Sequence, residues 1–561
     1  MNFLRSKLSE CIFGALAMAP GLTILWSWQR LTPLWSGSDD SEYWILAAHQ
    51  LRVLGMEGLA GLPRIYFASS PRPSILSFLG IPFLAVTEWD ALASNRLFGL
   101  FFFGIFAYFT YLLLSHFIKS RITVFLSSQL ILTAPIFFSF SLTLMPQIPL
   151  LTFIAASLYF YLTKRSWGFY FFSALAMTLR PIEGTALFVA TQYLVGIFRF
   201  SHNELRGREL LLTISLLVAL AAWIGWVFPL HYGWLWLFSP FFLLAAAMVF
   251  GRSIGVKYKY AESVFIPLGL SALWNLPHLF DIVNWFSYAT KNNYEAVPAE
   301  WSGSNAWLIE NVAYSFLGPH GLLLLLLALG FLAAGKISFR QSAVFIGACF
   351  ILALGVSAIC LTRNPVTRFC FDRYLAGYFY LGLASLYVTL DQIEVPRLLF
   401  RLTLAAALTS QLLAYSRFVV PGIPPFLQSS RWHEKSIYSM PVQTRFYLGK
   451  TLAEQVFLLL PDKNAGDFAL VNDSSEVPNI HLDFRLRSAE LKTDWKFSAV
   501  PNISQNFFIV DLTSSRKGQM LNPEKLAAEY VNSERERFAK IGSFSVNTES
   551  RKIQYALVKK M

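Results

Sequence analysis

Three carboxylates fall within four residues near the start of the chain, in Ser36-Gly37-Ser38-Asp39-Asp40-Ser41-Glu42-Tyr43. A carboxylate at the boundary between water and lipid is well placed to act as a general base, because it can accept a proton from a substrate hydroxyl. Asp39 and Asp40 are therefore candidate catalytic residues. The pattern also resembles a capping box, since Glu42 follows Asp39 by three residues and acidic groups stabilise the first turn of a helix. The two roles are compatible, because a cap holds a carboxylate in a fixed place.

Arginines form a second group of candidate functional residues. Arg180 lies between two apolar segments, and Arg373 lies at the start of another, in Phe371-Asp372-Arg373-Tyr374. The planar, forked guanidinium group suits the oxygen atoms of a phosphate. The alternatives are ion pairs of Arg180 with Glu183 and of Arg373 with Asp372, or side chains that extend to a membrane interface.

Aromatic and amide side chains are concentrated between residues 283 and 319. Such side chains often hold a sugar ring, and the alternative is an aromatic belt at a membrane interface. His320 follows this segment directly and is predicted to lie at the same surface. The sequence has no Walker A loop, no GxGxxG after a strand and no HExxH motif. Any reaction would therefore use a substrate that is already activated.

The composition predicts that most of the chain lies in a membrane. Hydrophobic residues make up 55% of the 561 residues and charged residues only 14%, against about 25% in soluble proteins. This excludes a disordered protein, a secreted disulfide scaffold and an ordinary cytosolic enzyme. The net charge is 46 − 33 = +13, but no nucleic-acid partner is predicted, because surplus Lys and Arg of membrane proteins usually lie in cytoplasmic loops. The four cysteines form no CxxC pair, so they indicate no metal site.

Fourteen apolar segments have lengths near that of a membrane span. They lie at 11–29, 74–90, 96–115, 122–142, 147–163, 167–180, 183–198, 210–228, 234–250, 263–282, 319–335, 341–361, 374–391 and 402–419. If the segment 74–90 does not cross, every basic short loop falls on one side, as the positive-inside rule requires. We therefore predict thirteen transmembrane helices, a juxtamembrane helix at 74–90, a cytoplasmic N-terminus and an extracytoplasmic C-terminus.

Two domains are expected. Residues 1–420 would form the transmembrane domain, whose first outside loop, 30–95, carries juxtamembrane helices. Residues 421–561 have the composition of a soluble protein and predict a small extracytoplasmic α/β domain. Its predicted strands are Phe468–Asn472, Phe507–Leu512, Gly542–Val546 and Ile553–Val558. Its predicted helix is Pro523–Phe538, with Asn522 as the N-cap and Pro523 at the first helical position.

These motifs, in this order, resemble the GT-C superfamily of membrane glycosyltransferases. The chain is most similar to the branch that contains the aminoarabinose transferases of lipid A and the protein O-mannosyltransferases. The matching elements are short, and they extend over residues 1–420. They are Asp39-Asp40-Ser41-Glu42-Tyr43 after the first span, Arg72-Pro73 before a juxtamembrane helix, Arg180-Pro181 between two later spans, and Arg373-Tyr374 at the start of a late span.

The resemblance implies a GT-C-like bundle of about 13 transmembrane helices in a bacterial inner (plasma) membrane. The implied reaction transfers a sugar from a polyprenyl-phosphate donor to a hydroxyl of a lipid, glycan or protein acceptor outside the membrane, with inversion. Asp39 would be the general base, and Asp40 would help to bind a divalent metal or shape the loop. Arg72, Arg180 and Arg373 would stabilise the donor phosphate. The implied substrate-binding residues are Glu42, Tyr43, Tyr374 and His320.

One position departs from the family pattern. Many members carry an acidic residue in the next outside loop, where this chain has Leu144-Met145-Pro146-Gln147. An amide is a poorer ligand for a divalent cation than a carboxylate, so no cofactor is predicted with certainty.

Two alternatives stay open: a transporter or flippase for a lipid or sugar, and a non-catalytic subunit of envelope glycan assembly. Transporters place ionisable groups near the bilayer midplane, whereas the predicted span centres here are almost free of charge.

Overall fold

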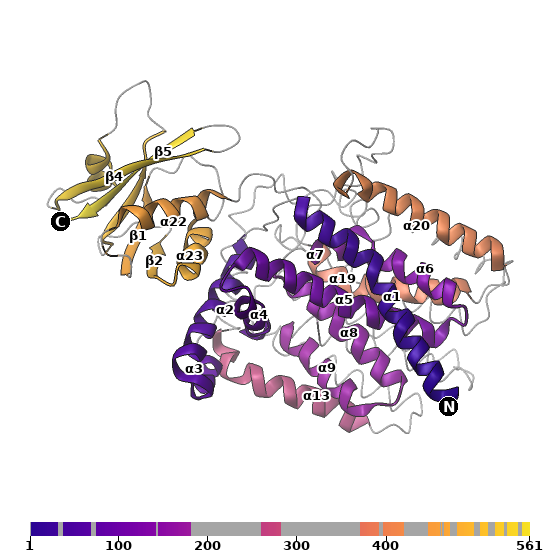
Figure 1. Ribbon diagram of the computed structural model, residues 1–561. Coiled ribbons are helices and arrows are strands. Elements are labelled where there is room, and N and C mark those ends of the chain that lie inside the picture. Colours follow the sequence, from indigo (N-terminus) through magenta and orange to yellow (C-terminus); the bar gives the residue numbers. More distant parts are fainter. Residues whose placement is uncertain are drawn as a thin grey trace, which may run out of the picture.

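The computed structural model describes residues 2–31, 38–68, 74–141, 144–180, 184, 260–281, 371–391, 397–419, 447–460, 462, 465–471, 480–498, 505–513, 522–531, 536–547 and 552–561. These residues form a helical body and a small sheet domain in the C-terminal part of the chain (Figure 1). The mostly helical architecture and the C-terminal domain of mixed helices and strands agree with the prediction.

The helical body has long helices whose starts are set by polar side chains. The Asp90 carboxylate accepts the backbone N–H of Ala93 at 2.9 Å, and the Ser120 hydroxyl accepts that of Thr123 at 3.3 Å. Each side chain satisfies a donor that the first turn leaves unpaired. The elements of the body are α1 (Asn2–Leu31), α2 (Ser38–Glu57), η1 (Gly58–Gly61), α3 (Leu62–Phe67), α4 (Ser74–Val86), α5 (Ala91–Phe117), α6 (Arg121–Leu132), α7 (Pro135–Phe140), α8 (Gln147–Leu162), α9 (Ser166–Leu179), α13 (Tyr260–Asn275), η3 (Leu276–His278), α19 (Phe371–Asp391) and α20 (Arg397–Val419).

Helix α5 is the one helix, among the described residues, that is long and apolar enough to cross a membrane. This supports membrane association but not the predicted number of thirteen spans. The predicted span 122–142 is divided into α6 and α7, because Pro135 has no N–H to continue the ladder and disfavours helix at the residue before it. Helix α4, with 13 residues, is about 20 Å long, which is shorter than the about 30 Å hydrocarbon core of a bilayer.

Contacts between neighbouring helices fix their directions. Between α1 and α5, Gly14 contacts Tyr108 and Gly21 contacts Phe103. Between α5 and α8, Phe102 contacts Thr152 and Phe109 contacts Tyr159. Between α6 and α20, Ser120 contacts Arg401 and Leu130 contacts Gln411. Helix α1 is therefore antiparallel to α5, α8 is parallel to α5, and α20 is parallel to α6. The short turn 163–165 reverses the chain between α8 and α9.

Helix α19 runs in the same direction as α5. Tyr380, near its middle, lies 3.2 Å from the Thr110 hydroxyl, and Asp391, at its end, lies near Arg401, which donates to Ser120 beyond the end of α5. Helices α1, α6, α9 and α20 thus run one way, and α5, α8 and α19 run the other. The membrane topology predicted when segment 74–90 is left out stays a prediction.

Large aromatic side chains fill the core of the helical body. Phe98, Phe103 and Phe106 of α5 are fully buried, as are Trp44 of α2 and Tyr380 of α19. Phe106 packs at 5.0 Å between ring centroids on Tyr380. The core therefore links the helices that precede residue 180 with α19, which lies far along the chain.

The sheet domain has three layers. Its elements are α22 (Tyr447–Leu459), β1 (Ala465–Val471), α23 (Ile480–Glu490), β2 (Asp494–Ser498), β3 (Phe507–Asp511), α24 (Pro523–Tyr530), β4 (Phe538–Asn547) and β5 (Lys552–Lys560), with the strand order β2-β1-β3-β5-β4. Strands β2, β1 and β3 are parallel, and β5 is antiparallel to both of its neighbours. Residues alternate between two cores: Phe468 and Leu470 face α22 and α23, while Ala469 and Val471 face α24.

The four predicted strands are confirmed as β1, β3, β4 and β5, with somewhat different ends. The predicted N-cap is confirmed too, because the Asn522 side chain accepts the N–H groups of Glu524 and Lys525. The predicted helix to Phe538 is wrong in length: α24 ends at Tyr530, and Phe538 instead pairs with Lys560 as the first residue of β4. Strand pairing overrides the helical pattern there.

Candidate functional site

Helix ends that carry candidate residues gather at one end of the helical body. We call it the Ala91 end: it comprises the last turns of α1 and α9 and the first turns of α5, α8 and α19. The helix directions place Arg180, after α9, and Arg373 and Tyr374, in the first turn of α19, at this end. The other end, where α5 finishes, is called the Phe117 end.

Helix α2 is fixed to the Ala91 end by Trp44. This side chain is fully buried, its indole N–H points to the Asn95 amide oxygen at 3.4 Å, and its ring packs edge-on against Phe98. The helix begins at Ser38, so Asp39 and Asp40 lie in its first turn. Asp39 is thus inside the helix and not at the capping position before it.

The neighbouring candidates Glu42 and Tyr43 differ in exposure. Glu42 is partly exposed, whereas the Tyr43 side chain is 6% exposed and belongs to the core of the helical body. Packing therefore accounts for Tyr43 more directly than substrate contact. Arg72, Glu183, His320 and the aromatic segment 283–319 lie outside the described residues.

Arg180 lies at the C-terminal end of α9. Its N–H donates to the Ala176 carbonyl at 3.2 Å, and its own carbonyl accepts the Gly184 N–H at 2.6 Å. Any side chain at position 184 would overlap the Ala176 carbonyl, so glycine allows the chain to fold back over the helix end. The Arg180 side chain is partly buried. The local backbone thus holds this arginine at the rim of the Ala91 end.

Two buried glutamines lie at the same end. Gln29, in the last turn of α1, and Gln147, the first residue of α8, are each 1% exposed. In the described part of the chain, neither amide oxygen nor amide nitrogen of either residue has a hydrogen-bond partner. Buried polar groups of native proteins are nearly always paired with protein, water or ligand. Within the described part of the chain, these four amide atoms are therefore open to another polar group.

A close backbone approach holds Gln29 in place. The Ser141 carbonyl, just after α7, lies so close to Gly99 of α5 that any side chain at position 99 would overlap it. The Gln29 amide nitrogen faces the same position. Gly99 therefore lets α1, α5 and the segment after α7 meet beside Gln29,.

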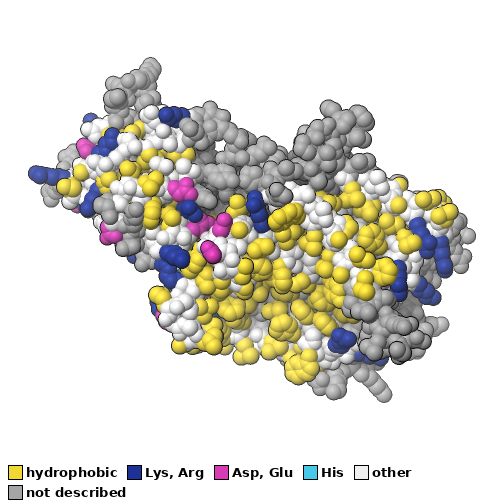
Figure 2. Space-filling model, viewed as in Figure 1, with side chains coloured by type: hydrophobic (Ala, Val, Ile, Leu, Met, Phe, Trp, Pro, Cys, Tyr) yellow, Lys and Arg dark blue, Asp and Glu magenta, His cyan; other side chains and the backbone are white. Residues whose placement is uncertain are grey.

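The Phe117 end is different, because several of its charged side chains have polar partners. Arg401 donates to the Ser120 hydroxyl at 2.9 Å, and Asp391 interacts electrostatically with Arg397 and Arg401. Arg121 lies 4.8 Å above the ring of Phe13. Figure 2 shows an apolar face over much of the helical body, with Lys and Arg side chains gathered at the right, away from the sheet domain.

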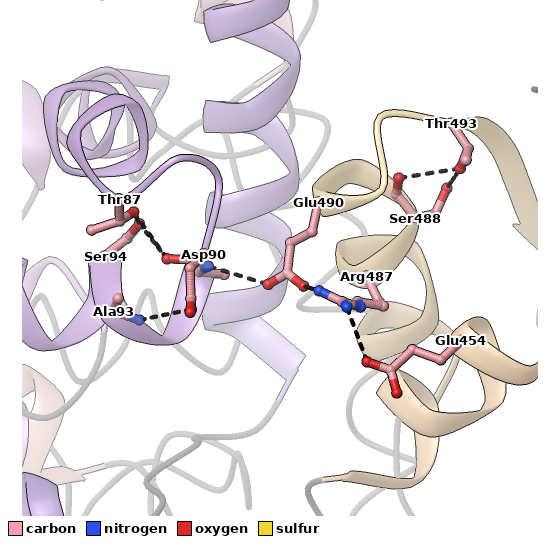
Figure 3. A network of polar contacts seen from close by, with 10 residues as sticks. Thr87, Asp90, Ala93, Ser94, Glu454, Arg487, Ser488, Glu490 and Thr493 are labelled. Atoms are coloured by element: carbon pink, nitrogen blue, oxygen red, sulfur yellow. Dashed lines mark hydrogen bonds and ion pairs between the residues drawn. The ribbon is translucent and has the colours of Figure 1, made fainter. Parts of the chain in front are cut away.

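The sheet domain contacts the Ala91 end through α23 (Figure 3). The Glu490 carboxylate accepts the N–H of Ala91, the first residue of α5, at 3.1 Å. Arg487 holds Glu490 at 2.5 Å and Glu454 of α22 at 3.0 Å. A negative group is favourable at a helix N-terminus, so the sheet domain supplies part of the cap of α5.

A second contact ties α23 to α2. Arg52 donates to the Thr493 carbonyl at 3.4 Å, and Leu486 is buried in the core of the helical body. The sheet domain therefore holds the second half of α2, the helix whose first turn carries Asp39 and Asp40.

Arg52, Glu490 and Gln29 were not predicted from the sequence. The one sequence feature that points to Glu490 is Arg487, which lies one helical turn before it and has the opposite charge,.

The structure identifies no metal ligands at these positions. Among the described residues, no group of three or more His, Cys, Asp or Glu side chains is arranged to hold a metal ion. Gln147 offers a neutral amide where a carboxylate would suit a divalent cation better. No chemical step is assigned to a metal here.

The function of the chain has to be inferred from its site residues, because comparison with known proteins gives no match. No family model matches the chain, and no curated protein matches it.

Proposed function

We propose that the chain is an integral membrane glycosyltransferase of the GT-C type. It would transfer a sugar from a polyprenyl-phosphate donor to an acceptor hydroxyl on the extracytoplasmic side of the membrane. One observation carries the proposal: the helix ends that bear Asp39, Arg180 and Arg373 gather at the Ala91 end. The proposed fold is the GT-C-like bundle that the resemblance implies, with about thirteen transmembrane helices.

The charges at the two ends support this orientation. The basic residues predicted to be cytoplasmic lie at the Phe117 end, in the turns after α5 and α8 and at the start of α20; they are Lys119, Arg121, Lys164, Arg165, Arg397 and Arg401. Cytoplasmic loops are enriched in Lys and Arg. The Ala91 end and the sheet domain would then face the outside.

The proposed chemistry uses residues of the Ala91 end. Asp39 accepts the proton of the acceptor hydroxyl, whose oxygen attacks the anomeric carbon. The bond from that carbon to the phosphate oxygen breaks, and polyprenyl phosphate leaves with both electrons, so the configuration inverts. Arg180 and Arg373 stabilise the charge that develops on the phosphate. The buried amides of Gln29 and Gln147 suit the hydroxyls of a sugar, because they can both donate and accept hydrogen bonds.

Gln147 also favours a second candidate, a non-catalytic subunit of glycan assembly. A chain that binds a lipid-linked sugar without transferring it needs polar contacts but no second carboxylate. The two candidates differ in one measurable property, which is whether a glycosidic bond forms. A transporter or flippase would instead move the lipid or sugar across proteoliposomes without forming a bond.

The test is Asp39→Asn in membranes supplied with a polyprenyl-phosphate sugar. We expect sugar transfer to fall by about 10²–10⁴-fold, the usual contribution of a general base, while the amount of inserted protein stays constant. Asp391→Asn, at the Phe117 end, is the matched control and should retain transfer. Transfer at the wild-type rate by Asp39→Asn would exclude Asp39 as the base. Sugar binding without transfer by the wild-type protein would favour the non-catalytic subunit.

A further inference from the structure

A surface groove lies where the sheet domain meets the helical body. Its volume is about 380 Å³, and it is lined by Leu51, Arg52, Gly55 and Met56 of α2, Ala85 and Trp89 at the end of α4, and Lys492 after α23. The walls are mostly apolar, while Arg52 and Lys492 supply two positive charges. A groove with this lining suits a ligand that has both an apolar chain and an anionic group.

Two of the lining residues have an unusual backbone conformation. Trp89 and Lys492 adopt left-handed φ angles of 75° and 57°, where glycine is the usual residue. Each lies in the turn that ends a helix: the Trp89 N–H donates to the Leu84 carbonyl, and the Thr493 N–H donates to that of Ser488. The Lys492 Nζ lies 5.5 Å from the centre of the Trp89 ring. Both side chains line the groove, and their contact joins the turn after α4 to the turn after α23.

The groove lies at the level where α5 begins. Ala85 and Trp89 come just before Ala91, the first residue of the candidate membrane-spanning helix. The end of a membrane span coincides with the lipid head groups, where Trp and basic residues are enriched. The groove that Arg52 and Lys492 line is therefore expected at the level of the lipid phosphates.

We propose that this groove binds an anionic phospholipid of the bilayer. Its phosphate lies between Arg52 and Lys492, and its acyl chain lies along Leu51, Met56 and Ala85. A lipid bound there touches α2, the turn before α5 and the turn after α23, so it joins the sheet domain to the helical body. The proposal uses the membrane placement but does not depend on sugar transfer.

The lipid-linked donor is a less suitable occupant. Arg52 and Asp39 are 13 residues apart on α2, which corresponds to about 20 Å along the helix axis. Reacting atoms must approach to about 3–3.5 Å. A phosphate held by Arg52 and Lys492 is therefore too far from Asp39 to be the leaving group.

The experiment compares lipid binding by two lysine variants. Lys492→Gly removes the charge and relieves the left-handed backbone, so it does not strain the fold. Lys164→Gly is the matched control, because Lys164 is also left-handed, with φ 58°, but lies in the turn between α8 and α9. Native mass spectrometry of the full-length protein in detergent would measure the affinity for phosphatidylglycerol, phosphatidylcholine and polyprenyl phosphate.

We expect phosphatidylglycerol to bind more tightly than phosphatidylcholine. Lys492→Gly should weaken phosphatidylglycerol binding about fivefold, which corresponds to about 1 kcal/mol for one basic side chain near an anionic surface. Lys164→Gly should leave it unchanged. Equal weakening by both variants, or no preference between the two phospholipids, would overturn the proposal. Displacement of phosphatidylglycerol by an equimolar amount of polyprenyl phosphate would show that the groove belongs to the donor.

Discussion

The two ends of the helical body treat their polar side chains differently. At the Phe117 end, Asp391 interacts electrostatically with Arg397 and Arg401, and Arg401 also donates to the Ser120 hydroxyl. At the Ala91 end, Gln29 and Gln147 are buried with no hydrogen-bond partner among the described residues. An unpaired buried polar group costs about 1–3 kcal/mol. Charged side chains at the Phe117 end thus stabilise one another, whereas Gln29 and Gln147 at the Ala91 end keep a cost that a hydrogen-bonding ligand would remove.

The largest expected effect is on the close approach that shapes the Ala91 end. We expect Gly99→Ala to lower the free energy of unfolding by about 2 kcal/mol, since the added methyl group overlaps the Ser141 carbonyl,. Gly269→Ala on α13 is the control, because nothing lies within 4 Å of the added carbon. That variant should be as stable as the wild type or slightly more stable. Thermal unfolding in detergent measures both, and equal stability of the two variants would contradict the described packing.

The next prediction compares two buried glutamines. Gln411 donates to the Leu130 carbonyl at 3.2 Å and to Thr133 at 2.9 Å, so Gln411→Leu should lower the free energy of unfolding by about 1–2 kcal/mol. Gln147→Leu removes an amide that has no hydrogen-bond partner among the described residues, so stability should stay the same or rise by about 1 kcal/mol while sugar transfer falls,. Unfolding and transfer would be measured on the same preparations. If both variants were equally destabilised, the contrast between paired and unpaired glutamines would be wrong.

The smallest effect concerns the contact between the sheet domain and α5. Glu490→Gln keeps an oxygen acceptor for the Ala91 N–H but loses the charge that favours the helix N-terminus and Arg487. We expect docking to weaken by about 0.5–1 kcal/mol, seen as faster proteolytic release of the sheet domain. Glu529→Gln is the control, because Glu529 is exposed on α24 and lies 3.8 Å from Lys525. Release at the same rate from both variants would argue against a capping role for Glu490.

Sequence patterns predicted the elements whose signals are local. Hydropathy located the helices of the body, and the Asn522-Pro523 pair located the start of α24. The division between α6 and α7 was missed although Pro135 marks it. Strand β2 was missed because five residues, Asp494–Ser498, give too short an alternation. Helix α23 was missed because its sequence, IHLDFRLRSAE, is polar on most of its surface.

The candidate site was predictable only where charge indicates a side of the membrane. The positive-inside rule predicts that Asp39, Arg180 and Arg373 lie at one surface of the membrane, and this stays a prediction. The Glu490 contact with Ala91 joins positions 399 residues apart, so no local pattern reveals it. The sequence gives no sign that Gln29 is buried, because its burial depends on Gly99 and Ser141, which are distant in the chain. Its position alone suggests an ordinary polar residue at the end of a span.

The position of β5 has a consequence for biosynthesis. This strand lies between β3 and β4 although it follows both in the chain, and its Tyr555 and Leu557 belong to the same core as Phe484 of α23. The residues of β5 must therefore leave the ribosome before α23 gains all of its packing contacts in the sheet domain. The helices of the body are synthesised first, so attachment of the sheet domain to Ala91 is a late event in folding. A nascent chain that stalls before β5 would expose α23 to cellular proteases.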